Sequence, residues 1–355
     1  MAVRMKDIAE DLGVSVVTVS KALKGHIDIS AATKERVLRR AKELNYQPSL
    51  HAQALASGQS YMVGFIVPDL VHAFFSEIAK SISQVLRTKG YGLLISSSDE
   101  NPGIERREIE QMIRHRVAVI LLASCQHDHD SLLKVAEQNV PYILVDRKFS
   151  KHKSHFVGTD DVLVGELATQ HLIDIGRRRI AHIGGQQVST SIDRLHGYRK
   201  ALAEHRIQVP GSYIVTRSLG DESGDITGRQ AMERLLKVVP RPDAVFCYND
   251  PAAIGAMDAI IAAGLRIPED IALVGAGNIR YSESLRIPLT SVDVSSASLG
   301  EHAGKLVLQL MAKKTPPGPR SVVVEPTLIV RQSTVQNGAA VSGPRIGSEL
   351  HSRSR

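Results

Sequence analysis

Short apolar runs alternate with helical stretches from Met62 to about Val330, and this alternation limits the folds open to the chain. Runs of consecutive apolar residues are typical of strands that parallel sheets bury on both faces. Nine or more strand and helix units are too many for one such sheet, so we expect two successive α/β lobes that divide near Asp160. The runs lie at 63–67, 92–95, 117–122, 142–145, 180–183, 213–215, 244–247, 271–274, 289–292, 322–324 and 327–330.

A different pattern occupies the first 48 residues, where apolar residues recur at helical spacing. Gly13 ends a first short helix at a turn, and Ser15 is a good N-cap for a second helix. Ser30 begins a third helix that runs to about Leu44. Two short helices joined by a tight turn form a helix-turn-helix, although the motif alone also fits a helical hairpin in another kind of domain.

The second helix of such a motif can enter the major groove of DNA, so its outward side chains are candidate DNA contacts. Val16 and Val17 offer apolar contact suited to a thymine methyl group, and Lys21 suits the acceptors of guanine. The full set of candidates in this segment is Lys6, Ser15, Val16, Val17, Thr18, Ser20, Lys21 and Tyr46.

Residues 49–56 predict a further short helix, which Pro48 and Ser49 begin and Ser57 and Gly58 end. A helix of about eight residues is too short to be stable alone in water, so we expect it to form only on DNA. Ala52 and Leu55 fall on one apolar stripe. That stripe can pack against a second copy of itself, which leaves Leu55 free to enter the minor groove as a wedge.

These segments together resemble the LacI/GalR family of bacterial transcription repressors. The resemblance implies a DNA-binding headpiece at 1–48, a hinge at 49–60, a two-lobed core like that of periplasmic binding proteins at 61–333, and a tail at 334–355. It also implies a homodimer on a palindromic DNA operator, a small-molecule effector, and Leu55 at the operator centre. The matching residues are Lys6, Asp7, Ile8, Ala9, Gly13, Val14, Ser15, Thr18, Val19, Ser20, Thr33, Arg36, Val37, Tyr46, Pro48, Ala52 and Leu55.

In the family, the two lobes exchange strands near the C-terminus. The resemblance therefore implies a first lobe of about 61–160 with 292–320, and a second lobe of about 161–291 with 321–333. The tail is rich in Gly, Ser, Pro and Arg, so we expect it to be disordered, and it carries no heptad repeat.

Polar side chains follow several of the predicted strands, where parallel sheets bind ligands. Carboxylates and guanidinium groups can hold vicinal hydroxyls, and an aromatic face can cover a sugar ring, so we expect a sugar or a sugar derivative. Each Asp after a strand could equally be only a helix N-cap. The candidates are Phe74, Phe75, Asp146, Arg147, Asp160, Arg194, Asn249, Asp250 and Asn278, and the resemblance places all but the two Asn residues in an effector cleft.

Two positions depart from the family pattern. Lys24 stands where the family usually has Asn, and Gly277 stands where it usually has an Asp. The second change removes a carboxylate that binds hydroxyl groups, so the cleft differs from one built for an ordinary neutral hexose.

Charge and composition narrow the function classes. The net charge is +7, and residues 1–60 carry nine Lys and Arg residues against six Asp and Glu, as phosphate contact requires. Two distant cysteines, and no signal peptide or membrane-spanning run, indicate a cytoplasmic protein. The alternatives are a free two-lobed sugar-binding protein, which would need a signal peptide, and an α/β enzyme, for which no nucleophile, cofactor loop or metal-site spacing is found.

Overall fold

The chain divides into two units between Tyr61 and Met62. The computed structural model describes residues 3–47, 60–126, 128–149, 153–216, 224–312 and 318–335. The hinge helix predicted at 49–56, with Ala52 and Leu55, lies outside the described residues, and so does the tail from residue 336 onward.

The first unit is a bundle of three helices, as predicted from the apolar spacing. Gly13 has a left-handed φ of 65° at the end of the first helix, which explains the break in the helical pattern there. Six buried residues, including Ile8, Val19 and Val37, form its small core. The helices are α1 (Met5–Leu12), α2 (Val16–Leu23) and α3 (Ala31–Glu43).

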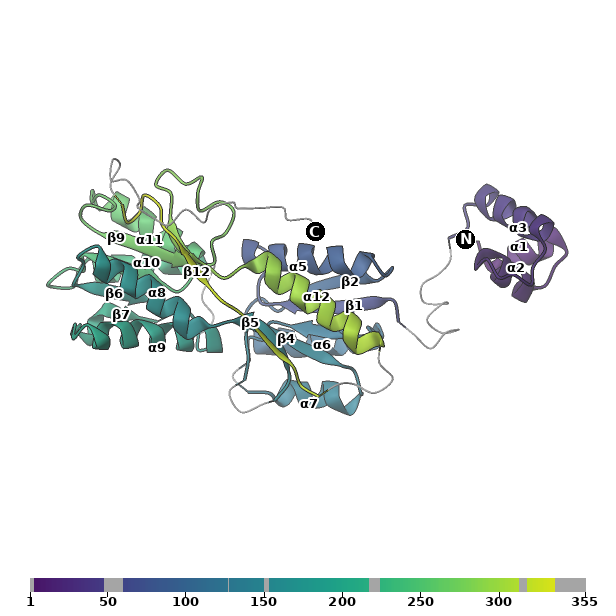
Figure 1. The fold of residues 1–355 in the computed structure, drawn as a ribbon, viewed down its shortest axis with the longest axis horizontal. Coiled ribbons are helices and arrows are strands. Elements are labelled where there is room, and N and C mark those ends of the chain that lie inside the picture. The colour runs from purple at the N-terminus through teal and green to yellow at the C-terminus, as the bar shows by residue number, and fades with distance from the viewer. Residues whose placement is uncertain are drawn as a thin grey trace, which may run out of the picture. The chain divides into compact units, whose positions relative to one another are not determined.

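The second unit consists of two α/β lobes, each with a sheet of six strands (Figure 1). The strand order is β11-β5-β4-β3-β1-β2 in the first lobe and β12-β10-β9-β8-β6-β7 in the second. All pairings in the described residues are parallel except that of β12 with β10. The two-lobed parallel fold predicted from the apolar runs is therefore confirmed.

Helices cover both faces of each sheet, which explains why the strands are continuously apolar. In the first lobe, α5 and α12 pack on one face, and α6 and α7 on the other. The first-lobe elements are β1 (Met62–Val67), α5 (Ala73–Arg87), β2 (Gly92–Ser97), α6 (Pro102–Arg114), β3 (Ile120–Leu122), α7 (Asp130–Glu137), β4 (Tyr142–Val145), β5 (His155–Thr159), α12 (Ser296–Ala312) and β11 (Ser321–Val324).

In the second lobe, α8 and α9 cover one face of the sheet, and α10 and α11 cover the other. The apolar core under α8 and α9 is continuous with that of the first lobe. The elements are α8 (Asp161–Asp174), β6 (Ile180–Ile183), α9 (Ser189–Glu204), η1 (Gly211–Tyr213), β7 (Ile214–Val215), α10 (Gly224–Leu235), β8 (Ala244–Cys247), α11 (Asp250–Ala262), β9 (Ala272–Ala276), β10 (Thr290–Asp293) and β12 (Thr327–Ile329).

The chain crosses between the lobes three times: after β5, after β10 and after β11. The predicted lobe boundaries were wrong at the last crossing, because β11 pairs with β5 in the first lobe rather than lying in the second. Only β12 returns to the second lobe, beside β10. The core also extends past residue 333, since Thr334 is buried and its hydroxyl lies 2.8 Å from that of Thr290.

Candidate DNA-binding surface and ligand cleft

The start of α2 exposes apolar side chains to solvent, although the headpiece has only a small apolar core. Ser15 caps the helix, because its hydroxyl oxygen accepts a hydrogen bond of 3.0 Å from the backbone N–H of Thr18. Val16 and Val17, in the first turn, are 41% and 63% exposed. This exposure is what base contact by an apolar side chain requires.

The other predicted DNA contacts lie in different surroundings. Lys6 is exposed, and its ammonium lies 3.4 Å from the Glu10 carboxylate. Lys21 donates a hydrogen bond to Asp28 and lowers the pKa of that carboxyl. Tyr46 packs against the headpiece core, and burial raises the pKa of its hydroxyl. The half-buried members of the predicted set are Thr18, Ser20, Lys21 and Tyr46.

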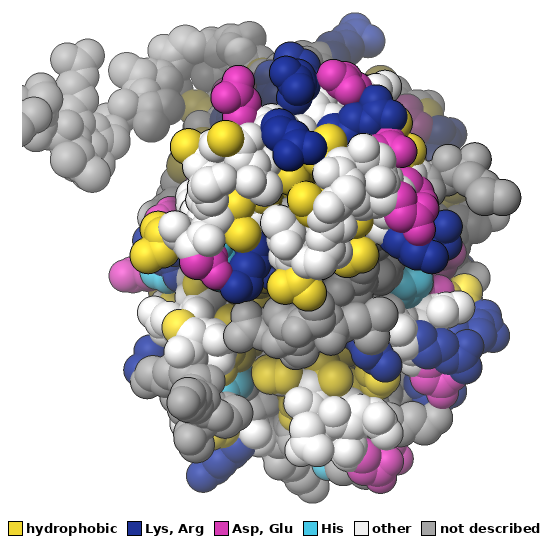
Figure 2. Space-filling view, turned by 90° about the vertical axis from the view of Figure 1, so that its right-hand side faces the viewer, with side chains coloured by type: hydrophobic (Ala, Val, Ile, Leu, Met, Phe, Trp, Pro, Cys, Tyr) yellow, Lys and Arg dark blue, Asp and Glu magenta, His cyan; other side chains and the backbone are white. Residues whose placement is uncertain are grey.

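Basic side chains do not form one continuous patch on the face that Figure 2 shows. Lys and Arg side chains, in dark blue, lie interspersed with acidic and apolar ones on this face. Within the headpiece, some basic side chains pair with acidic ones, as Lys6 does with Glu10 and Arg40 with Asp11.

A cavity of about 350 Å³ lies where the two lobes of the core meet. It brings together six of the nine residues predicted for the ligand site: Phe74, Phe75, Asp146, Arg147, Arg194 and Asn249. The remaining lining residues are Pro68, Asp69, Val71, His72, Asp99, Glu100, Thr190, Gly224, Tyr248, Ala276, Gly277 and Val294.

Asp146 and Arg147 follow β4, as predicted, and an unusual backbone positions them. Asp146 has a left-handed φ of 65°, and the N–H of Arg147 donates to the carbonyl of Val145 at 2.7 Å. Arg147 binds the Glu100 carboxylate through both terminal nitrogens, at 2.8 and 2.9 Å. Burial, together with the nearby Asp161 carboxylate, raises the pKa of Asp146 to about 7.

Arg194 lies in the second turn of α9, the helix that follows β6, and not directly at a strand end. Its Nε donates to the Asp161 carboxylate at 2.8 Å, and one terminal nitrogen donates to the carbonyl of Tyr248. Burial raises the pKa of Asp161, and the charge of Arg194 opposes that rise. The guanidinium thus links α9 to α8 and to the segment that follows β8, at the edge of the cavity.

Three of the residues predicted for the ligand site are not among those that line the cavity. Asp160 is the exposed N-cap of α8 and accepts a hydrogen bond from Leu163 N–H. Asp250 is fully buried and accepts from Ile279, Ser282 and Ser291. Asn278 turns its side-chain oxygen to Arg331, 2.8 Å away.

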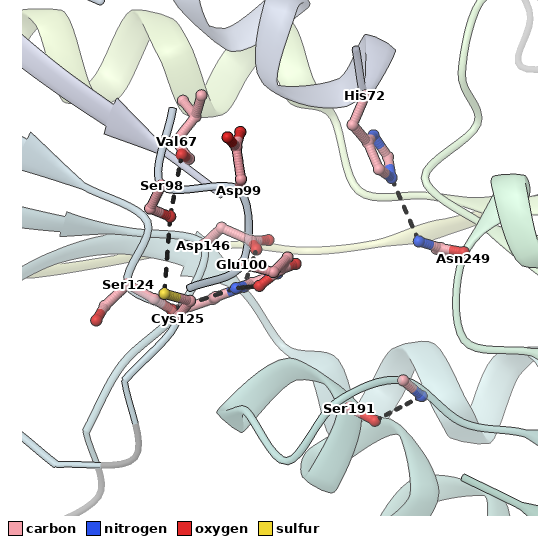
Figure 3. Close-up of polar contacts among 12 residues, drawn as sticks. Val67, His72, Ser98, Asp99, Glu100, Ser124, Cys125, Asp146, Ser191 and Asn249 are labelled. Atoms are coloured by element: carbon pink, nitrogen blue, oxygen red, sulfur yellow. Dashed lines mark hydrogen bonds and ion pairs between the residues drawn. The ribbon is translucent and has the colours of Figure 1, made fainter. Parts of the chain in front are cut away.

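Several cleft residues were missed in the sequence. His72 is the N-cap of α5, and Asp99 and Glu100 follow β2 after one intervening residue, so an Asp-Glu pair close to a strand end was a usable signal. The rings of Phe74 and Phe75 meet edge to face, 5.0 Å apart, at the start of α5. Figure 3 shows Glu100 and Asp146 close together, although they follow β2 and β4, which are not adjacent in the sheet, and it shows His72 and Asn249 facing each other to one side of them.

Gly277, where the family pattern has Asp, lines the cavity without a side chain. Its φ of 124° lies in a region that L side chains rarely adopt. The buried Asp250 carboxylate lies behind it, 3.8 Å from where a Cβ at residue 277 would be. The cavity wall at this position is therefore backbone.

Within the described parts of the chain, His, Cys, Asp and Glu side chains form no group of three that could hold a metal ion. None of the helices described there has the length and apolarity that a membrane span requires.

The fold and the cavity define a class of protein: a two-lobed ligand-binding core that follows a helix-turn-helix headpiece. Two family models match the chain, that of the bacterial regulatory proteins of the lacI family at residues 4–49 and that of the periplasmic binding protein-like domain at residues 169–334. Curated relatives extend the match to the whole chain. The chain belongs to the LacI family of bacterial transcriptional regulators.

One relative is the HTH-type transcriptional regulator GalR of Escherichia coli (strain K12), which is 34% identical over 99% of both chains. Another is the transcriptional repressor PurR of Mannheimia succiniciproducens, 30% identical over 93% of this chain and 98% of its own. The solved lac repressor dimer bound to operator and the anti-inducer ONPF has a TM-score of 0.82 and 27% identity, covering 94% of this chain and 100% of that one. A complex of the regulator CelR with cellobiose has a TM-score of 0.69 and 29% identity, and the match covers 93% of this chain and 99% of that one.

Proposed function

We propose that this regulator is a repressor that binds a palindromic operator as a homodimer and responds to a small molecule held between its lobes. The observation that carries the DNA-binding part is the capped start of α2, where Val16 and Val17 are exposed. A helix of this kind can place its first turn against base edges. Binding takes place in the cytoplasm, at the nucleoid.

The effector is a small polyhydroxyl molecule, a sugar or a sugar derivative, in the cavity between the lobes. Support comes from the cavity lining, which combines two aromatic rings with carboxylates and guanidinium groups. Lac repressor, one of the structural neighbours, is solved as an operator complex with a ligand, and CelR as a complex with cellobiose. A change in the angle between the lobes would alter the spacing of two hinge segments in a dimer and so change operator affinity.

Selection of binding sites from random duplex DNA tests the placement of α2. We expect Val17→Ala to change the preferred sequence, because its apolar contact to a thymine methyl is lost. Lys6→Ala should weaken binding to all sequences alike, because a phosphate contact carries no sequence information. An unchanged preferred sequence for Val17→Ala would contradict the proposed contact.

A further inference from the structure

The first-lobe sheet has one edge at which all its strands begin, because every strand pairing in it is parallel. The described segments directly before those strands, counted from the last residue of any preceding helix, are 60–61, 87–91, 114–119, 137–141, 153–154 and 318–320. These segments contain six Lys and Arg residues, all exposed, against a single acid, Glu137. We call the six residues the basic edge: Arg87, Lys89, Arg114, Arg116, Lys153 and Arg320.

The basic edge has few partners within the protein. Among the described residues, no carboxylate forms an ion pair with any of its six members. Arg320 donates a hydrogen bond of 2.9 Å to the side-chain oxygen of Gln309, which is uncharged. The dipole of a helix favours a basic residue in its last turn, and this accounts for Arg87 and Arg114. The other four cations lie outside helices, so the helix dipoles do not account for the whole set.

The corresponding edge of the second lobe is also basic, but its cations are used differently. Arg179 pairs with Asp243 at 3.5 Å, and Arg266 pairs with Asp270 at 2.9 Å. Arg177 donates hydrogen bonds to two backbone carbonyls in the segment before β9. Three arginines of the second-lobe edge are therefore bound within the protein, whereas the basic edge keeps its charges for an outside partner.

The basic edge lies at the end of the core to which the headpiece is joined. β1 begins at Met62 and lies between β2 and β3, so cations before both neighbouring strands flank the point where the chain enters the core. The cavity lies at the other ends of these strands, and the second lobe lies beyond it (Figure 1). The 12 residues between Gln47 and Ser60 span at most about 45 Å, little more than one helical turn of DNA. DNA held by the headpiece is therefore within reach of the basic edge.

We propose that the basic edge binds backbone phosphates of the operator duplex, so that the core adds sequence-independent contacts to those of the headpiece. The proposal rests on the proposed function, in which the headpiece binds operator DNA. Exposed guanidinium and ammonium groups bind DNA phosphates in exchange for counterions. A sheet of six strands is about 24 Å wide, which equals the length of about seven base pairs. The spacing of the cations therefore fits a stretch of duplex better than one small anion.

The charges of the headpiece support a contribution from the core. Within the described headpiece, acidic side chains already pair with five of the basic ones, which lowers the positive charge that it presents to DNA. Cations outside the headpiece therefore add to its attraction for phosphates. The five paired residues are Arg4, Lys6, Lys21, Arg39 and Arg40.

The dependence of DNA affinity on salt counts phosphate contacts, because each contact contributes about 0.9 to the slope of log K against log[salt]. The probe is a random-sequence duplex of about 30 base pairs, and its affinity for the full-length protein is measured by fluorescence anisotropy at several NaCl concentrations. The test variant, Lys89→Gln with Arg116→Gln, removes one cation on each side of β1. We expect the slope to become less steep by about 1.8 for each protomer in contact.

Lys237→Gln with Arg206→Gln is the matched control. It also removes one exposed Lys and one exposed Arg before strands, but in the second lobe. Arg116 and Arg206 both have a left-handed φ, of 53° and 55°, so the two variants face the same backbone requirement. We expect the control to keep the wild-type slope, although its net charge changes by the same amount.

A charge-preserving variant separates phosphate contact from a structural role. Lys89→Arg with Arg116→Lys keeps both charges and should keep the wild-type slope. A slope that falls in this variant as much as in the Gln variant would overturn the proposal, because shape rather than charge would then matter.

Two other results would also overturn the proposal. One is an equal slope for wild type and Lys89→Gln with Arg116→Gln, which an edge that binds an acidic protein would give. The other is an equal change in the second-lobe control, which would show an effect of net charge alone. Failure of site selection to yield any preferred sequence would contradict the proposed function instead, while the slope on random duplex would still decide whether the basic edge binds phosphates.

Discussion

Replacing Arg194 with Met tests how the buried ion pair at the edge of the cavity contributes to stability. Nε of Arg194 lies 2.8 Å from Oδ1 of Asp161, and the two side chains are 7% and 4% exposed. Removing the cation leaves a buried carboxylate without its partner, which in other proteins costs about 3–5 kcal/mol. Met preserves most of the length and apolar contact of the side chain, so the lost charge dominates the effect.

The expected magnitude follows from protonation. The variant can avoid a buried charge by protonating Asp161, whose ordinary pKa is 3.8. Protonating such a carboxyl at pH 7 costs about 4 kcal/mol, and at pH 5 about 1.5 kcal/mol, at about 1.4 kcal/mol for each pH unit. A group with a raised pKa in the folded state loses its stabilising contribution as pH rises. The variant should therefore lose about 4 kcal/mol at pH 7 and recover most of it at pH 5.

Urea unfolding followed by far-ultraviolet circular dichroism at pH 5, 6 and 7 measures these differences. Lys200→Met is the matched control, because Lys200 pairs with Glu166 between the same two helices but its side chain is 47% exposed. Its loss should be much smaller, because water screens an exposed ion pair. The double variant with Asp161→Asn should recover most of the stability at pH 7. A loss below about 1 kcal/mol at pH 7, or one that does not shrink on acidification, would refute this reasoning.

Three further predictions concern packing, pH and the hinge. Gly197→Ala places a Cβ 2.0 Å from the carbonyl oxygen of Val162, so thermal unfolding should show a loss of about 1–3 kcal/mol in stability. Gly211→Ala, whose Cβ would meet no atom within 4 Å, should cost much less stability. Equal losses for the two variants would contradict this prediction. The raised pKa of Asp146 should make wild-type stability fall as pH rises from 5 to 8. In urea titrations, Asp146→Asn should flatten this dependence of stability on pH. An unchanged slope of stability against pH would contradict the assigned pKa. Leu55→Ala should reduce operator affinity and DNA bending in gel-shift assays while ligand affinity stays constant, and unaltered bending would exclude a wedge at this position.

The sequence predicted the fold well because its signals are local. Continuous apolar runs specify buried parallel strands, and Gly13, Ser15 and Ser30 act within one turn of their own position. The partner sheet of β11 was not predictable in this way. Val322–Val324 and Thr327–Ile329 are two short apolar strands separated by Glu325 and Pro326, and nothing in either pattern records which sheet each one joins.

The ligand site was predictable only to within one residue at each helix start. Asp160 caps α8 in solvent while its neighbour Asp161 is buried against Arg194, and Asn249 faces the cavity while Asp250 lies beneath it. Strand-end reasoning places both members of each pair at the right edge. It cannot decide which side chain faces the cavity, since that depends on the direction in which each helix leaves its strand.

The three crossings between the lobes have a consequence for how the protein is made. On the ribosome, neither sheet can be completed until the last fifteen described residues have emerged, because β11 closes one edge of the first and β12 one edge of the second (Figure 1). Until then β5 and β10 are open edges, the kind of surface on which unfinished chains aggregate. A nascent or truncated chain that stops before Ser321 therefore carries two unpaired strand edges. The final segment covers both of them, because β11 pairs with β5 and β12 pairs with β10.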